Sequence, residues 1–486
     1  MNPTIGCCPV PGPAVVAAKS RLKEQVKSVS VRHADQGADA VAQVTAARQQ
    51  LADSAASAQW NAAQRFVVVV TVGLLGMRIV IADSLNITVG LVLSAILIPL
   101  WIRTIRLYRG ATIRLVTGVL AVVSGLILTR ISSTDHQVEI KHMVSTSMVV
   151  LTLLFGFGVV LWGRTLIRDA SLVTAFGVGL TLGISTTSTG FLINPWRFGY
   201  SVPITVVVLG LAALLRSRWL ELAAVLLLLI VSALNGARST SAILLLAALF
   251  ICWQMLPKTS TRRTSGMKTV LAVGVLGLVI YNFGQSLILG GSLGDDAQSR
   301  SQAQIDTTGS LILGGRPELA ATANLMLHHP QGFGSGTLPS LDDLNVAKAG
   351  MAAINVDPNN GYVERFMFGN GFELHSTFGD LWANYGIVGL IFALTILLVG
   401  LRAFGESMAR QAISGIVLFL TIKMIWNIFF SPLLTSVPLL TLLMALVLIP
   451  KLEFLERKAL KTKSSPRRRR RRSRSVRRGE RQLSKV

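Results

Sequence analysis

The sequence predicts an all-α polytopic membrane protein with about twelve transmembrane helices. Of its 486 residues, 51% are hydrophobic and only 14% are charged, whereas a soluble domain carries about 25% charged residues. The apolar residues gather in runs of about 20, which is the length needed to cross a bilayer. This composition excludes a soluble enzyme.

The apolar runs divide the chain into five segments. An Ala-rich segment, 1–64, precedes nine predicted spans in 65–288. A large extracytoplasmic loop, 289–380, is followed by three further spans in 381–450 and by an Arg-rich tail, 451–486. The predicted spans are 65–82, 86–102, 114–131, 144–163, 170–192, 201–215, 219–234, 240–256, 268–288, 381–401, 411–430 and 433–450.

Basic residues predict the orientation of these spans, because cytoplasmic connections are enriched in Lys and Arg. With a cytoplasmic N-terminus, the cytoplasmic connections hold 14 basic residues and the opposite short connections hold four. We therefore expect both termini to be cytoplasmic. The first set is Arg103, Arg106, Arg109, Arg114, Arg164, Arg168, Arg216, Arg218, Lys258, Arg262, Arg263, Lys268, Arg402 and Arg410, and the second is Arg130, Lys141, Arg197 and Arg238.

The Arg-rich tail accounts for much of the formal net charge of +24, since it holds 16 Lys or Arg and three Asp or Glu. We interpret it as a topology anchor attracted to anionic membrane lipid. Docking of an acidic partner or of nucleic acid is the alternative, and we expect no nucleic acid. The three cysteines, Cys7, Cys8 and Cys252, lack the spacing of a disulfide framework or a zinc site.

The large loop is the predicted place for chemistry, because a loop of this length without structure of its own is unusual unless it is functional. It holds four Lys or Arg and ten Asp or Glu. A helix is expected to begin at Arg316-Pro317, and the glycines of 332–336 are expected to let the loop fold tightly against the membrane domain. The acidic pairs Asp295-Asp296 and Asp342-Asp343 are interpreted as solvated loop acids.

Three residues on the predicted outer face are candidates for a site. Arg238 follows the turn between the seventh and eighth spans, and its simpler interpretation is an Arg at the membrane interface. Arg316, at a helix start, is suited to bind phosphate, or else forms a surface salt bridge, for instance to Glu318. His375 precedes the tenth span and is suited to act as a general base, although a lone His is more often structural.

The order of motifs resembles the O-antigen ligase and polymerase superfamily of bacterial GT-C-type glycosyltransferases. The motifs are Arg316-Pro317, then His329-Pro330-Gln331-Gly332-Phe333-Gly334, and then 375–390, which begins His-Ser-Thr-Phe-Gly-Asp and ends Gly-Ile-Val-Gly-Leu. The resemblance covers about residues 230–400, and the topology extends it. Residue 320 is Ala, where relatives often have an aromatic residue.

The resemblance implies a function and a site. Members transfer a glycan from a polyprenyl-pyrophosphate lipid carrier to an acceptor hydroxyl, on a glycan, a glycolipid or a protein, at the outer face of the bacterial plasma membrane. They need neither metal nor other cofactor. The family's key positions match Arg238 and Arg316, as ligands of the pyrophosphate, and His375, as the catalytic base. The single dominant loop favours the ligase members over the polymerases.

Elementary chemistry agrees with these roles, since two arginines can stabilise a leaving pyrophosphate. A single displacement implies inversion at the anomeric carbon. Glu373 and Asp380 are rival bases because they flank His375, and Arg197 is a weaker candidate for a third phosphate contact. Two alternatives stay open: a twelve-helix transporter, and a metal-dependent transferase that uses polyprenyl-phosphate sugars.

Overall fold

The computed structural model describes residues 59–256, 294–411 and 413–451 and short pieces of 271–291. The chain forms two compact units, Met1–Val67 and Val68–Val486, and every element after the helix Gln59–Met77 belongs to the second. The predicted segment 1–64 for the most part, the ninth span for the most part and the tail after residue 451 lie outside the described residues.

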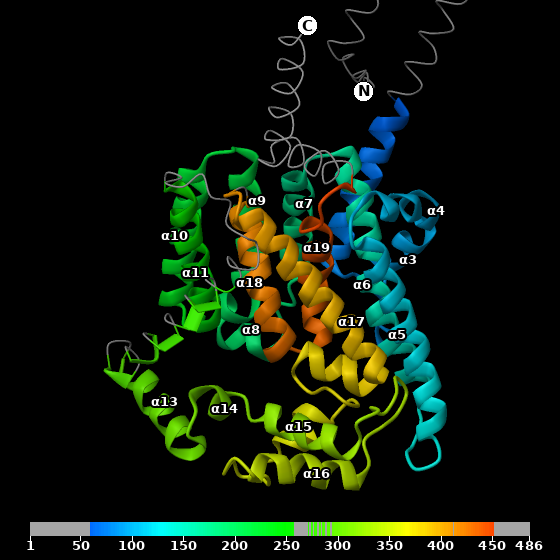
Figure 1. Cartoon of the computed structure of the whole chain (residues 1–486), viewed down its shortest axis with the longest axis vertical. Coiled ribbons are helices and arrows are strands. Elements are labelled where there is room, and N and C mark those ends of the chain that lie inside the picture. The colour runs from blue at the N-terminus through cyan, green and yellow to red at the C-terminus, as the bar shows by residue number, and fades with distance from the viewer. Residues whose placement is uncertain are drawn as a thin grey trace, which may run out of the picture. The chain divides into compact units, whose positions relative to one another are not determined.

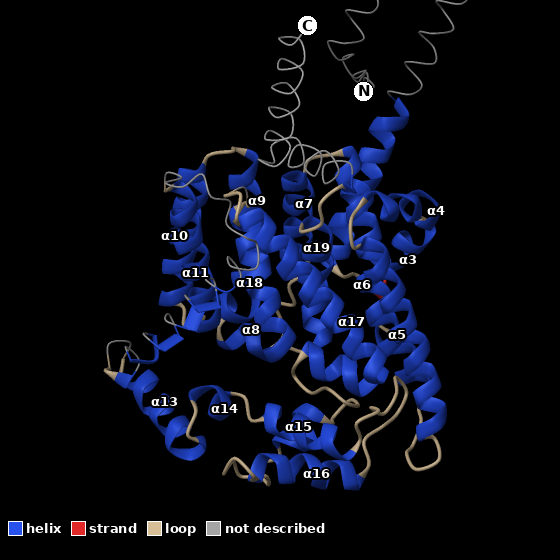
Figure 2. Cartoon of the chain, in the orientation of Figure 1, coloured by secondary structure: helices blue, strands red, loops and turns tan. Residues whose placement is uncertain are grey.

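The described residues are nearly all helical (Figure 2). The helix Gln59–Met77 is followed by a small antiparallel ribbon of β1 (Val80–Ala82) and β2 (Ile87–Thr88) around the short helix η1 (Asp83–Leu85). The next elements are α3 (Val89–Ile96), α4 (Ile98–Trp101), η2 (Ile102–Leu107), α5 (Ala111–Ser132), α6 (Ile140–Leu166), α7 (Asp169–Leu182), α8 (Thr189–Ile193), η3 (Trp196–Tyr200), α9 (Ser201–Leu214), α10 (Arg218–Leu234) and α11 (Arg238–Met255).

The later elements belong to the predicted outer loop and the last spans. The loop contains α13 (Asp295–Thr308), α14 (Leu311–Gly315), α15 (Glu318–His328), α16 (Leu341–Ala352) and the π-turn η4 (Val363–Met367). The helices α17 (Thr377–Met408), α18 (Gly415–Phe430) and α19 (Leu433–Leu446) follow. We call the end of the helices that joins 294–380 the loop end; α15 and α16 lie there (Figure 1).

Six of the described helices are long and apolar enough to cross a membrane, or seven if one bent pair counts as a span. They are Gln59–Met77, α5, α6, the stretch Trp196–Leu214, α11 and α17, and the bent pair is α3 with Ile98–Leu107. Three shorter apolar helices, α7, α18 and α19, lie at further predicted spans. The chain is therefore an all-α protein built for a membrane.

Two predicted spans differ in shape from a straight helix. Span 86–102 bends by 58° between α3 and α4, where Pro99 stands in the first turn of α4 and offers no N–H to continue the preceding helix. Span 170–192 stops at Leu182, and the chain then forms the separate short helix α8.

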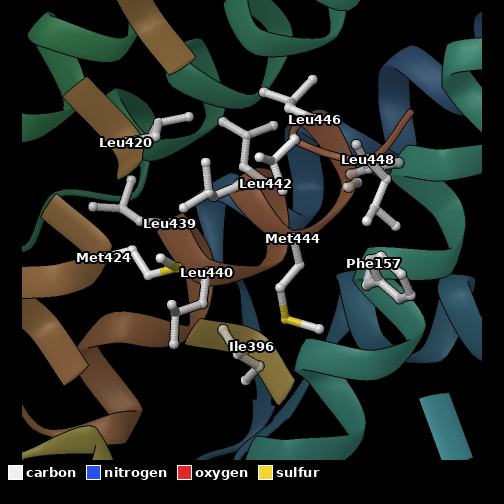
Figure 3. Packing of buried hydrophobic residues seen from close by; sticks show 14 of the residues in the cluster. Phe157, Ile396, Leu420, Met424, Leu439, Leu440, Leu442, Met444, Leu446 and Leu448 are labelled. Atoms are coloured by element: carbon white, nitrogen blue, oxygen red, sulfur yellow. The ribbon is translucent and has the colours of Figure 1, made fainter. Parts of the chain in front are cut away.

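One hydrophobic core joins the spanning helices, and Figure 3 shows its centre, where residues of α17, α18 and α19 meet Phe157 of α6. Many large apolar side chains point outward instead, among them Leu120, Ile127, Leu227 and Leu398. Apolar surface on this scale marks a lipid or protein contact, which is the pattern of a membrane-embedded bundle.

The prediction that Arg114 lies in a cytoplasmic connection is wrong. Arg114 lies within α5, and its side chain is fully buried. Its guanidinium donates to the carbonyls of Ile396 and Met444. This arginine therefore joins α5 to α17 and α19 and is not a free cytoplasmic charge.

A second, smaller core lies in the loop segment. Ala321 and Leu325 of α15 pack with Met351 of α16, Val363 of η4 and Trp382 at the start of α17. The predicted helix at Arg316-Pro317 is confirmed, since α15 begins at Glu318 with Pro317 as its N-cap. The loop is thus a folded layer with an apolar interior of its own.

The glycine-rich segment 329–336 fixes this layer to the spanning helices, as the sequence predicted. Gly386 has a backbone (φ 66°, ψ −151°) that interrupts α17, so the carbonyl of Ala383 is free to accept from the N–H groups of Phe333 (2.8 Å) and Gly334 (3.0 Å). A Cβ at Gly334 would collide with the backbone of Thr129 in α5. Only glycine allows so close an approach.

Candidate functional site

His375 presents one ring nitrogen as a potential base. Its Nδ1 lies 3.0 Å from the carbonyl oxygen of Glu373, and a carbonyl can only accept, so Nδ1 carries the hydrogen. In the neutral ring Nε2 then keeps its lone pair. The residue is half-buried and has a positive φ of 56°, which is uncommon for a non-glycine residue. The loop therefore holds this imidazole in a single tautomer, and Nε2 has no hydrogen-bond partner among the described residues.

A ring contact and two polar contacts connect His375 to Arg316. The ring of Tyr362 lies beside the imidazole, with centroids 6.0 Å apart. The Tyr362 hydroxyl donates to Glu318 Oε2 at 3.4 Å, and Arg316 Nη1 lies 3.2 Å from Glu318 Oε1. Burial, and then the charge of Glu318, raise the pKa of Tyr362 well above its ordinary value. The hydroxyl thus stays protonated and remains a donor.

Arg316 combines an ion pair with open donors. The salt bridge to Glu318 that the sequence allowed is present, and that carboxylate is only 2% exposed. The Arg316 side chain is about one third exposed (33%). Within the described residues only Nη1 has a partner, so the rest of the planar fork can bind an oxyanion.

Lys423 is a candidate residue that sequence reasoning missed. It lies in α18 and is half-buried. The sequence did contain a signal for this residue, since Lys423 is the only charged residue in Gly415–Phe430. An ionisable side chain inside a membrane span points to function by default.

Arg238 and Arg197 belong to a separate place at the loop end. Asn194 Nδ2 donates to the carbonyl of Asn235 at 2.9 Å, which joins the segment before η3 to the turn before α11. Arg197 is exposed and lies over the ring of Phe198 at 4.8 Å. Arg238 is exposed at the start of α11, and its side chain has no hydrogen bond or ion pair within the described part of the chain. No described contact brings either arginine to Arg316 or His375.

Asp380 is occupied by the backbone. Its Oδ1 accepts from the N–H of Leu374 at 2.7 Å and its Oδ2 from the N–H of Leu433 at 2.6 Å, and it is 5% exposed. Glu373 uses its backbone to hold Met367 and His375, while its carboxylate is half-buried and acts electrostatically on Asp380. Of the two rival bases to His375, Asp380 is thus the one whose carboxylate oxygens both already accept a hydrogen bond.

The pair Asp342-Asp343 corrects the prediction of solvated acids. Asp342 is exposed, but Asp343 is 1% exposed at its side chain. It completes the capping box of α16 with Ser340 and lies 3.0 Å from His136 Nε2. The other ring nitrogen of His136 is 2.8 Å from Asp135. Burial alone would lower the pKa of His136, but the hydrogen bonds and charges of the two carboxylates outweigh it and raise that pKa.

The described residues contain no group of three or more His, Cys, Asp or Glu placed to hold a metal ion. Comparisons of the chain with protein-family models, with curated proteins and with solved structures return no match.

Proposed function

We propose that this protein is an O-antigen ligase-like glycosyltransferase that moves a glycan from a polyprenyl-pyrophosphate carrier to an acceptor hydroxyl. The observation that supports this most is the chain Arg316–Glu318–Tyr362–His375 at the loop end. It brings a guanidinium suited to bind phosphate and an imidazole whose Nε2 has no partner among the described residues into one layer, at the end of an apolar helix bundle.

In the proposed reaction His375 Nε2 accepts the proton of the acceptor hydroxyl while that oxygen attacks the anomeric carbon. The bond from this carbon to the pyrophosphate oxygen breaks at the same time, so the configuration inverts. Negative charge develops on the departing pyrophosphate, and the donors of Arg316 lie preorganised to stabilise it. The reaction needs no metal in this scheme. Arg238 is kept as a further phosphate contact from the resemblance, and Arg197 as a weaker candidate for a third contact.

The proposed topology follows from the sequence. It has twelve spans, both termini in the cytoplasm and the layer 294–380 on the outer face of a bacterial plasma membrane. The basic tail then meets anionic lipid of the cytoplasmic leaflet. A cysteine-accessibility map tests the orientation, with Ser299 as an outer position and Ser217 as a cytoplasmic one.

The direct test is glycan transfer by the purified protein from a polyprenyl-pyrophosphate donor in EDTA. We expect His375→Ala and Arg316→Ala to lose at least about a hundredfold in rate, the lower range for general-base catalysis and for an electrostatic contact. Matched controls are His328→Ala and Arg300→Ala, which are exposed residues of the same layer, and they should keep the wild-type rate.

Several results would count against the proposal. Full activity in both site variants would mean that the site is wrong. Activity lost in EDTA and restored by Mg²⁺ would favour the metal-dependent class. No transfer by folded wild type from any of several donors and acceptors would favour the transporter.

A further inference from the structure

The segment α4–η2, Ile98–Leu107, has a buried side and an exposed side. The buried side is anchored in the bundle, since Trp101 is 1% exposed and its indole N–H donates to the carbonyl of Ser94 at 2.8 Å. The other buried side chains are Thr104, Ile105 and, directly after η2, Tyr108. This packing fixes which side chains face outward. They include Leu100, Ile102, Arg103, Arg106 and Leu107.

The 3₁₀ geometry of η2 places Arg103 and Arg106 in one row. A 3₁₀-helix has three residues per turn, so side chains three positions apart project in the same direction, about 6 Å apart along the axis. In an α-helix the same spacing would turn the second side chain away by about 60°. Ile102 and Leu107 stand next to the two arginines in the sequence and are exposed. The two guanidinium groups therefore share one ridge with apolar neighbours.

Neither of these arginines is paired with an acid of the described chain. Arg103 and Arg106 have no hydrogen bond or ion pair within the residues that the structure describes. The next residue of the row, Arg109, differs from them, because Glu406 of α17 lies 4.0 Å from its guanidinium. Two neighbouring like charges repel each other, and an anion that contacts both removes this repulsion. The pair is therefore a place where two charges attract an anion together.

The row lies at the end of the bundle opposite the loop end. Helix α6 begins at the loop end, where the N–H of its N-cap Glu139 donates to the carbonyl of Gly336. Tyr108, directly after η2, lies at the other end of α6. It forms an isolated bridge with Pro450, and Arg164 in the last turn of α6 lies over its ring at 5.1 Å. Exposed basic and apolar side chains next to each other, at the end of an apolar bundle, are typical of a membrane interface.

We propose that Arg103 and Arg106 bind the phosphate of an anionic phospholipid whose acyl chains lie along Ile102 and Leu107. The phosphate accepts charge-assisted hydrogen bonds from both guanidinium groups. A lipid fits this surface better than a soluble anion does, because acyl chains cover the apolar side chains beside the charges. The site is separate from the proposed glycosyltransferase site and from the Arg-rich tail, and it does not depend on glycan transfer.

The test is titration of phosphatidylglycerol into the full-length protein in an uncharged detergent, with binding measured by native mass spectrometry. The double variant Arg103→Gln/Arg106→Gln removes both charges of the row. The matched control is Arg168→Gln/Arg216→Gln, which removes two charges from exposed positions outside η2. We expect the first variant to weaken the tightest binding of phosphatidylglycerol about tenfold or more, since each charge contributes roughly fivefold. The control should stay within about threefold of wild type, and phosphatidylcholine should bind wild type more weakly than phosphatidylglycerol does.

Several results would overturn the inference. Wild-type lipid binding by Arg103→Gln/Arg106→Gln would show that the two arginines are no ligands, and equal weakening in the control would assign the attraction to overall charge. Equal affinity for phosphatidylglycerol and phosphatidylcholine would refute an anionic headgroup, and displacement by an equal concentration of glycerol 3-phosphate would assign the pair to a soluble anion. If the double variant fails to fold, a photoactivatable phosphatidylglycerol decides on the wild-type protein: its cross-links should include Ile98–Leu107, and their absence there would refute the site.

Discussion

Replacing Asp380 by Ala should destabilise the protein before it affects any chemistry. The two carboxylate oxygens accept from Leu374 and Leu433 at 2.7 Å and 2.6 Å. Leu433 is the first residue of α19, so its N–H has no partner inside its own helix. Removing the carboxylate leaves two buried N–H groups without acceptors.

The expected cost follows from these two bonds. Leaving a buried N–H group without an acceptor costs about 1–3 kcal/mol, so Asp380→Ala should lose about 2–6 kcal/mol of stability. Asp380→Asn keeps one acceptor oxygen but places an NH₂ group against the other N–H, and should lose about half as much. Because Leu374 precedes His375, the same substitutions also release the backbone that positions the imidazole.

The assay is the midpoint of thermal unfolding in detergent, followed for wild type, both variants and the exposed control Asp342→Ala. The midpoint should fall most for Asp380→Ala, less for Asp380→Asn and not at all for the control. A wild-type midpoint for Asp380→Ala would refute the reasoning. An Asp380→Asn protein that is fully stable yet inactive in glycan transfer would instead make Asp380 the base.

Three further predictions concern His136, Gly386 and Glu318. Because the folded protein raises the pKa of His136, the contribution of this residue to stability is complete below the unfolded pKa of about 6.5 and is lost as pH rises through the folded pKa. The thermal midpoints of wild type and His136→Gln should therefore converge in alkaline buffer. A difference between the two midpoints that stays constant with pH would contradict this. Gly386→Ala places Ala in a backbone region that essentially only Gly adopts, at a cost of about 1–3 kcal/mol, so the midpoint of thermal unfolding should fall. The control Gly73→Ala lies inside the helix Gln59–Met77 and meets only an ordinary contact of 3.7 Å, so it should not lower the midpoint. Glu318→Ala frees Arg316 and should slow glycan transfer more than Glu318→Gln, which keeps an acceptor oxygen; equal rates for the two variants would argue against a positioning role.

Part of the site was predictable because it depends on local order in the chain. Arg316 before a helix and His375 before a span are features of short segments, and both lie where the sequence placed them. Tyr362 and Glu318 became part of the site only through folding, since 44 residues separate the hydroxyl from the carboxylate that it contacts. Lys423 was visible in the sequence as a single charge in an apolar run.

The sequence by itself determined that the chain is an all-α membrane protein with a large polar segment between apolar helices. Composition and the length of apolar runs are sufficient for this, because inside a bilayer every backbone N–H and C=O group must be hydrogen-bonded within the protein, and an α-helix does this within a single segment. The tertiary structure decided which charged and polar side chains have hydrogen-bond or ion-pair partners. Asp380 accepts from backbone N–H groups, Asp343 contacts His136, and Arg114 is buried against two carbonyls. Arg316 and His375 keep polar atoms that have no partner in the described part of the chain. Such assignments depend on contacts between distant segments, and no local pattern contains them.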